Sequence, residues 1–255
     1  MQWSLVGSEM CIRDSNLARV CREFGLGMGL GSCRSLLHND NNLADFDVRK
    51  IMGDDLPLYA NLGVAQLESM ISQKRFDSLK DLIAKLKVDG LIIHVNPLQE
   101  WLQPEGDRFQ HAPIDTIKRL LDVIDFPIIV KEVGQGFGYQ SLQALLQLPL
   151  AAIDFAANGG TNFAKLELFR SDPENQTLFK PLARVGHSAL DMVEICNALI
   201  DQLGENIACH QLIISGGVNN FLDGYYLTQK VRLPAIYGQA SSFLKYARGE
   251  YEGLQ

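Results

Sequence analysis

Short, continuously apolar segments recur along the chain, about one every 25–40 residues, which is the spacing of strands in βαβ units. Most of them do not alternate between apolar and polar residues, and this is typical of strands that are covered on both faces. We therefore predict seven buried strands, at residues 26–31, 56–63, 90–96, 126–133, 151–156, 211–217 and 234–239.

Between these segments the hydrophobic residues follow helical spacing. The clearest example is 69–87, where Leu79, Leu82 and Leu86 form an apolar stripe and charged residues fill the opposite side. We predict helices at residues 16–24, 69–87, 113–124, 139–147, 188–203, 221–230 and 241–251.

Alternation of strands and helices predicts a parallel sheet. For a chain of 255 residues the two leading architectures are a (β/α) barrel and a doubly wound sheet. We expect an α/β fold of the TIM (β/α)8-barrel type over residues 16–255, lacking its first strand, because a barrel of this type closes with eight strands. The glycines at 25–31 alternate inside a predicted strand, so they do not form a dinucleotide-binding fingerprint.

The first fifteen residues, MQWSLVGSEMCIRDS, show no clear helical or strand period and lack the layout of a secretory signal. They resemble translated adaptor sequence. We expect that residues 1–15 are not part of the native protein and that the natural chain begins further upstream. A genuine disordered N-terminus is the alternative.

The composition, with 47% hydrophobic and 21% charged residues, is that of a globular protein. A net charge of −7 argues against a nucleic-acid partner, and no apolar run approaches the length of a membrane-spanning helix. The five cysteines and five histidines are scattered without the spacing of a metal site. Unpaired thiols favour a reducing compartment, so we expect a cytoplasmic location.

Polar residues follow most of the predicted strands, at the edge where barrels carry their active sites. SGGV at 215–218 and YGQAS at 237–241 each precede a predicted helix, a pattern that favours phosphate binding and that a tight structural turn also explains. Lys131 ends a very apolar strand, so its ammonium needs an anionic partner. That partner is either a bound anionic cofactor or an internal carboxylate.

The segment HVNPLQEWLQPEGDRF at 94–109 places Gln99, Glu100, Glu105 and Asp107 in one stretch after a strand. Mg²⁺ typically binds one or two carboxylates together with substrate phosphates, so this stretch is a candidate metal site. A solvated acidic loop is the alternative interpretation.

From about Asn16 onward the chain resembles the type 2, flavin-dependent isopentenyl-diphosphate isomerases. HVNPLQEWLQPEGDR resembles the family's H-x-N-x-x-Q-E and Q-P-E-G-D-R motifs, and MGLGSCR, ANLG, IIVKEVG, NGGTNFAKLE, ISGGV and GQASSFLK support it in order. The resemblance implies a barrel that binds FMN, Mg²⁺ that holds a diphosphate substrate, and NADPH as reductant. It also implies a homo-oligomer, a tetramer or larger.

The resemblance further assigns roles to residues. Gln99 would be the catalytic residue beside the substrate alkene, and Glu100 would bind the metal. Arg34, His94 and Asn96 would contact the diphosphate side of the substrate. The flavin contacts would be Ser32, Asn61, Lys131, Thr161, Gly216, Gly217, Ala240 and Ser241.

Several features depart from the family pattern. Cys33 stands where the family has glutamine, so an amide near the substrate would be lost. The family's N-terminal basic motif and its first strand, with an A-M-T-G-G segment, have no counterpart in this sequence. We therefore expect this polypeptide to bind FMN weakly and to turn over poorly.

Two other functions fit the same pattern. One is an FMN-dependent oxidoreductase of the 2-hydroxy-acid oxidase type, in which His187 would be the base. The other is an inactive remnant, because an open seven-stranded barrel exposes two strand edges that favour aggregation or oligomerisation.

Overall fold

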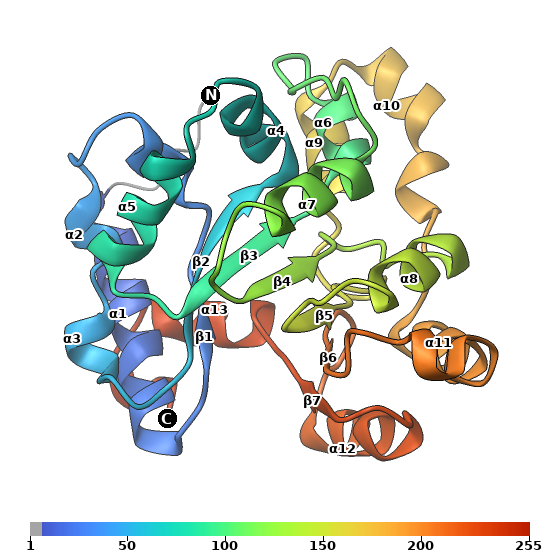
Figure 1. The fold of residues 1–255 in the computed structure, drawn as a ribbon. Helices are drawn as coiled ribbons and strands as arrows, with labels where there is room; N and C mark the ends of the chain where they lie inside the picture. The colour runs from blue at the N-terminus through green and yellow to red at the C-terminus, as the bar shows by residue number, and fades with distance from the viewer. Residues whose placement is uncertain (1–6) are drawn as a thin grey trace.

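The computed structural model describes the backbone of residues 7–255 and the side chains from residue 13 onward. Seven strands form one sheet in chain order, and each neighbouring pair is parallel (Figure 1). Each strand lies within one of the predicted segments, so the seven positions are confirmed, but the first and last strands are partly exposed and not buried as predicted. The strands are β1 (Met28–Gly29), β2 (Leu58–Gly63), β3 (Gly90–His94), β4 (Ile128–Lys131), β5 (Ala152–Asp154), β6 (Leu212–Ile214) and β7 (Ala235–Tyr237).

The sheet curls but does not close. In the described part of the chain, β1 pairs only with β2 and β7 only with β6, so these two strands are the edges. The expected TIM-type barrel is thus present as an open, curled half-barrel, with helices packed around its outer side (Figure 1).

Thirteen α-helices occur in the described residues, and each predicted helical segment overlaps at least one of them. Five helices, α2, α3, α6, α9 and α10, were not predicted. The helices are α1 (Gly7–Phe24), α2 (Leu43–Phe46), α3 (Arg49–Met52), α4 (Val64–Ser72), α5 (Phe76–Leu86), α6 (Pro97–Leu102), α7 (Pro113–Leu121), α8 (Tyr139–Leu146), α9 (Phe163–Arg170), α10 (Pro173–Phe179), α11 (Ala189–Leu203), α12 (Phe221–Lys230) and α13 (Ser241–Ala247).

One predicted helix is wrong in its extent. The segment 69–87 is divided between α4 and α5, and Lys74 at the break has a φ of 56°, in the left-handed region. The apolar stripe itself is confirmed, because Leu79, Leu82 and Leu86 are all buried against the main core.

Helix α1 begins earlier than the pattern predicts, at Gly7 rather than Asn16. The predicted part of this helix is held by tertiary contacts. Asn16 Nδ2 donates to the carbonyl oxygens of Ala247 and Gly249, and Val20 packs with Ala247 beside it, so α1 and α13 lie side by side. Residues 1–6 lie outside the described residues, and the origin of the 1–15 segment stays a prediction.

The two faces of the sheet differ in chemistry. The outer face carries buried aliphatic side chains that join the helices in the main core. The inner face carries a smaller apolar cluster built on Ile92, Ile129 and Ala152. Since side chains alternate along a strand, residues two positions further along lie on the same inner face. These residues, at or just past the carboxyl ends of the strands, are polar: Asn61, His94, Lys131, Asp154 and Ser215.

Candidate functional site

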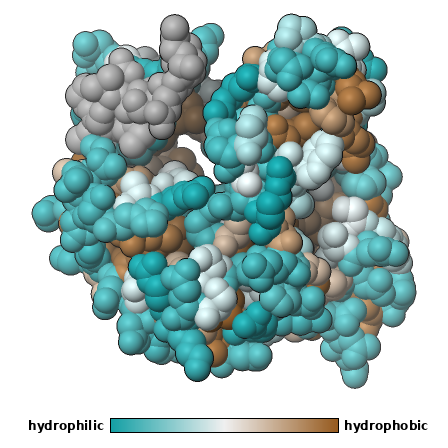
Figure 2. Space-filling model, turned by 90° about the horizontal axis from the view of Figure 1, so that it is seen from above, coloured by the Kyte–Doolittle hydropathy of each residue, from teal (hydrophilic) through white to brown (hydrophobic). Residues whose placement is uncertain are grey.

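The inner-face polar residues form a row across neighbouring strands. His94 is the register partner of Lys131, and Lys131 is the register partner of Asp154. The face seen from above in Figure 2 looks onto the carboxyl ends of the strands, and it is mainly hydrophilic with a hollow near its centre. The structure therefore brings the predicted residues of three strands together at the expected edge of the half-barrel.

Lys131 has an internal partner. Its ammonium donates to the Glu132 carbonyl oxygen at 2.7 Å, and burial lowers its pKa against the opposing charge of Asp154. Asp154 is bound in turn by the Ser215 hydroxyl, and burial raises the pKa of its carboxyl group. An internal carboxylate thus accompanies Lys131, whose ammonium still lies on the inner face where an anionic ligand could use it.

Ser215 also holds a strained turn. Ala156 has a φ of 38°, and its N–H donates to the Ser215 hydroxyl oxygen at 2.9 Å. A backbone angle in this region costs about 1–3 kcal/mol for a residue other than glycine. The loop after β5 is therefore fastened to the end of β6 at a defined position.

The two glycine pairs of these loops lie against each other. A Cβ atom on Gly216, whose φ is 83°, would lie 2.2 Å from main-chain atoms of Ala157, and one on Gly159 would lie 3.0 Å from Gly217 Cα. Glycine at these positions is required by backbone packing between the loops after β5 and β6. The structural turn that we considered for SGGV is present, and it does not exclude phosphate contacts from the same loop.

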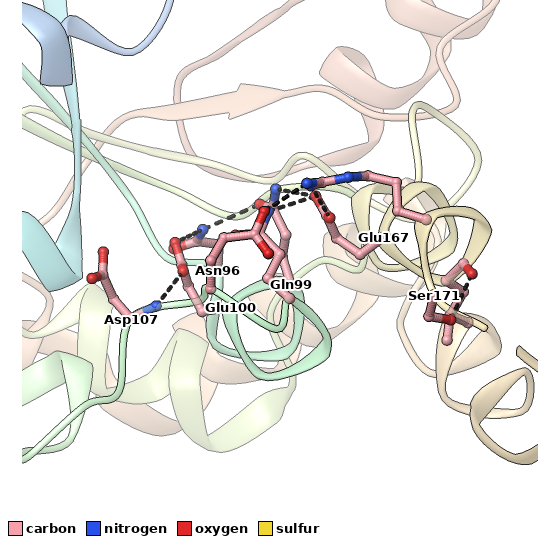
Figure 3. Close-up of polar contacts among 10 residues, drawn as sticks. Asn96, Gln99, Glu100, Asp107, Glu167 and Ser171 are labelled. Atoms are coloured by element: carbon pink, nitrogen blue, oxygen red, sulfur yellow. Dashed lines mark hydrogen bonds and ion pairs between the residues drawn. The ribbon is translucent and has the colours of Figure 1, made fainter. Parts of the chain in front are cut away.

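Helix α6 carries the catalytic candidate. The stretch that we considered as a solvated acidic loop begins instead as a helix with Pro97 at its start, a position where the missing N–H of proline costs nothing. Gln99 and Glu100 lie on this helix, and Glu100 is only 6% exposed. Figure 3 shows their side chains together with that of Asn96 in one hydrogen-bonded group.

Both ends of this group are fixed by neutral donors. Asn96 Nδ2 donates to Gln99 Oε1 at 3.1 Å and to Glu100 Oε1 at 2.9 Å, while the Asp107 N–H donates to Glu100 Oε2 at 2.8 Å. The hydrogen bond from the Asp107 N–H requires the chain at Gly106 to pass close to α6. Only glycine fits there, because a Cβ at residue 106 would lie 1.9 Å from the Glu100 carbonyl oxygen.

Glu167 on α9 is a site residue that our sequence reasoning missed. It is buried, and its Oε1 accepts from Gln99 Nε2 at 3.2 Å and from Gln103 Nε2 at 2.6 Å (Figure 3). Arg170 donates to its other oxygen at 2.6 Å. The available signal was the motif NGGTNFAKLE, which ends on Glu167.

Arg34 reaches the same region from the loop after β1. Its guanidinium lies 3.3 Å from Asp107 Oδ2, which also accepts from Gln66 Nε2 at 2.8 Å. Cys33 beside it is fully buried in the main core, and burial raises the pKa of its thiol to about 11. Cys33 stands where the family has glutamine, and its side chain lies in the core. It therefore offers no amide to a ligand at this position.

The remaining flavin candidates are not part of the row of polar side chains on the inner face. Ser32, Thr161, Ala240 and Ser241 are exposed residues of loops, or of the first turn of α13, that follow strand ends. His187, the base of the alternative oxidoreductase, joins two loops through its main chain: its N–H donates to the Gln135 carbonyl and its carbonyl accepts from the Asn158 N–H.

The donor set around Glu100 fits a hydrated divalent cation. Among the residues that the structure describes, no group of three or more acidic, histidine or cysteine side chains forms a metal cage. Mg²⁺ usually keeps several waters and takes few protein carboxylates, so one carboxylate suffices when phosphate supplies the other oxygens. The buried Asn96 Oδ1 has no partner in the described residues and would accept from a metal-bound water.

The chemical character of the proposed flavin-binding residues is compatible with a flat, anionic cofactor. Lys131 offers a half-buried ammonium group on the inner face, and the loops after β5 and β6 offer closely packed main chain beside it. The surface cavities between α1 and the C-terminal turn, lined by residues such as Arg19 and Tyr251, contain none of the candidate residues.

Within residues 7–255, no helix combines the length and the apolar character needed to cross a membrane. The cysteines whose side chains are described, Cys21, Cys33, Cys196 and Cys209, are buried free thiols.

The fold and the site define an α/β protein with a curled parallel sheet and a row of polar side chains at the carboxyl ends of its strands. No protein-family model matches the chain. Curated proteins with a similar sequence do match it. Isopentenyl-diphosphate delta-isomerases of Rickettsia akari and Rickettsia africae are each 34% identical over 248 residues, which covers 96% of this chain and 68% of each relative, and that of Rickettsia typhi is 33% identical over the same length.

The chain therefore belongs to the isopentenyl-diphosphate delta-isomerase family, and these relatives support an isomerase function. Among solved structures, the EAL enzyme Bd1971 in its cAMP- and cyclic-di-GMP-bound form gives a TM-score of 0.36 at 12% identity. That comparison covers 93% of this chain and 49% of the other, so the chain spans about half of that protein. A similarity this low carries no argument about fold or function.

Proposed function

We propose that this protein is an isomerase of the flavin-dependent type 2, which interconverts isopentenyl and dimethylallyl diphosphate with reduced FMN and Mg²⁺. The observation that carries the proposal is the group of side chains on and around α6. There the Gln99 amide and the Glu100 carboxylate lie in one buried hydrogen-bonded group at the carboxyl edge of the sheet. The same segment holds the family-like motif H-x-N-x-x-Q-E.

FMN would lie over the inner face, near Asn61 and Lys131 and the loops that carry Thr161, Gly216 and Gly217. When bound and reduced, with NADPH as the electron donor, it would supply the acid–base group that moves protons at the substrate. Lys131 would stabilise negative charge on the flavin ring, because a buried ammonium interacts strongly with an anion. Ser32, Ala240 and Ser241 complete the proposed flavin contacts.

Gln99 would orient the hydrocarbon part of the substrate. Its Oε1 accepts from Asn96 and its Nε2 donates to Glu167, so both ends of the amide are held. A side chain that is locked in this way loses little entropy when it contacts a ligand, and preorganisation of this kind supports catalysis.

The diphosphate would lie between Glu100 and Arg34. Glu100 would hold Mg²⁺, and the ion would bind phosphate oxygens that the carboxylate alone would repel. Arg34 is partly exposed and paired only with a surface carboxylate. It can therefore turn to phosphate oxygens, which its planar guanidinium binds in a bidentate manner.

The proposal is tested by anaerobic incubation of the protein with isopentenyl diphosphate, FMN, NADPH and Mg²⁺ in D2O. We expect deuterium to enter substrate and product, read by NMR over many turnovers so that slow isomerisation is detected. The exchange should need FMN, reductant and Mg²⁺ together, and Gln99→Ala should reduce it at least tenfold, about the factor that corresponds to 1.4 kcal/mol in the barrier.

Other outcomes would overturn the proposal. Deuterium exchange that proceeds without flavin would remove the type 2 assignment, and no exchange with all components would remove the isomerase activity of this polypeptide. Stoichiometric reduction of bound FMN by a 2-hydroxy acid would favour the oxidoreductase with His187 as base. Sedimentation of the same sample tests the proposed homo-oligomer.

A further inference from the structure

The tautomer of His94 follows from its neighbours on β2. Asn61 Nδ2 donates to the Leu30 carbonyl oxygen at 3.1 Å, and a carbonyl can only accept, so the orientation of the Asn61 amide is fixed. Its Oδ1 therefore faces His94 Nδ1 at 2.8 Å. Because Oδ1 can only accept, His94 carries its proton on Nδ1.

The second ring nitrogen is then an acceptor unless the ring is charged. The groups around the ring disfavour a charge: Lys131 on β4 is a cation, Asn61 on β2 and Gln66 on α4 are neutral, and Asp107 is occupied by Gln66 and Arg34. Burial first, and then the Lys131 charge, lower the pKa of His94 to about 3. At neutral pH, Nε2 thus has a free lone pair.

A second acceptor lies beside this lone pair. Gln66 Nε2 donates to Asp107, so its Oε1 points the other way, toward Gly63 at the end of β2. A Cβ atom built on Gly63 would lie 2.7 Å from His94 Nε2 and 2.2 Å from Gln66 Oε1. His94 Nε2 and Gln66 Oε1 therefore lie close to the same position beside Gly63. Both atoms are hydrogen-bond acceptors, and the proposed function places the diphosphate there.

We propose that a diphosphate enters this site together with one proton, which is shared between His94 Nε2 and a phosphate oxygen. This inference rests on the proposed function. The proton comes from solvent, a P–O–H···N hydrogen bond forms, and no other bond changes. Without that proton, lone pairs on nitrogen and oxygen would face each other across the contact.

The proton leaves a thermodynamic signature. When binding takes up a proton, the affinity falls as pH rises, by about tenfold per pH unit for one proton. The heat of binding also changes with the ionisation heat of the buffer, and the slope of that dependence counts the protons. Neither effect is expected from a histidine that only fills space.

The experiment is calorimetry of inorganic pyrophosphate with Mg²⁺ binding to the full chain, in PIPES and in Tris at one pH. We expect proton uptake by the wild-type chain to exceed that of His94→Gln by about one proton per site. His111→Gln is the matched control, because His111 lies on the exposed loop before α7, and it should keep the wild-type value. Asn61→Asp, which offers a carboxylate to Nδ1, should stabilise the charged ring and reduce the uptake.

A measurement without ligand keeps the inference testable if a variant does not fold. ¹⁵N NMR of the wild-type chain at pH 7 should show His94 protonated on Nδ1 and not on Nε2. A proton on Nε2 would overturn the inference. So would pyrophosphate binding with equal proton uptake in wild type and His94→Gln, and this result would leave the diphosphate site intact. Failure of pyrophosphate to bind would overturn the site as well.

Discussion

The carboxylate of Glu167 connects α9 to the catalytic candidate on α6, and Glu167→Gln tests that connection. The substitution keeps the shape of the side chain but removes its charge and turns one acceptor oxygen into a donor. In the structure one oxygen accepts from Gln99 and Gln103 and the other accepts from Arg170. Whichever way the new amide is turned, its NH₂ group faces at least one N–H donor.

A hydrogen bond to a charged group contributes about 1.5–3 kcal/mol, and the variant loses at least one of them in a buried place. We expect urea denaturation to show a free energy of unfolding about 1.5–3 kcal/mol below that of the wild type. Glu105→Gln is the control, since Glu105 binds the same Arg170 from an exposed position and should change little. Equal losses in the two variants, or a loss below about 0.5 kcal/mol for Glu167→Gln, would refute the reasoning.

Three further outcomes follow from the structure. Gly216→Ala should lower the thermal midpoint by several degrees, because strain at positive φ alone costs about 1–3 kcal/mol, whereas Gly253→Ala, with open space around it, should not. Phe155→Ala, in the fully buried core, should lower the free energy of unfolding by about 3–5 kcal/mol in urea denaturation. Glu68 accepts three hydrogen bonds from Gln110 and His111, and those from His111 are the main cause that lowers its pKa against the effect of burial. Its contribution to stability is therefore present above the unfolded-state pKa and is lost as pH falls through the lower folded value, so acid titration of Glu68→Gln should show a flatter loss of stability than the wild type.

The five inner strands, β2 to β6, could be predicted because both faces of each are largely buried, so each is a short apolar run in the sequence. The edge strands β1 and β7 are partly exposed. Ile128, Ile129 and Val130 show this: they point alternately to the main core and to the inner cluster, and all three are buried. The polar residue that follows each apolar run could be placed at the carboxyl edge of the sheet, because the ends of parallel strands lie at the same edge. The open sheet could be expected only from the count of seven strands against the eight of a closed barrel, and not from the local pattern of any one strand.

Features set by distant contacts could not be predicted. The break between α4 and α5 falls at Lys74 without glycine or proline to mark it. Helix α6 has only six residues, too few to show a helical period, and it is held by Asn96 and by a loop that returns to Glu100. Glu167 lies 68 positions from Gln99 in the chain, and no spacing rule connects them. In each case a tertiary hydrogen bond or packing contact overrides the local signal.

The hydrogen bonds around the site leave a particular set of atoms free. The side-chain NH₂ groups of Asn96, Gln99 and Gln66 each donate a hydrogen bond to a neighbouring carboxylate or amide oxygen. Three acceptor atoms of this group have no hydrogen bond in the described part of the structure: Asn96 Oδ1, Gln66 Oε1 and His94 Nε2. An anion gains nothing from acceptors, so in the proposed function a diphosphate at this edge would be bound by Arg34, by a metal ion at Glu100 and by the proton at His94. Under that proposal, the affinity for diphosphate should depend on Mg²⁺ and on pH together.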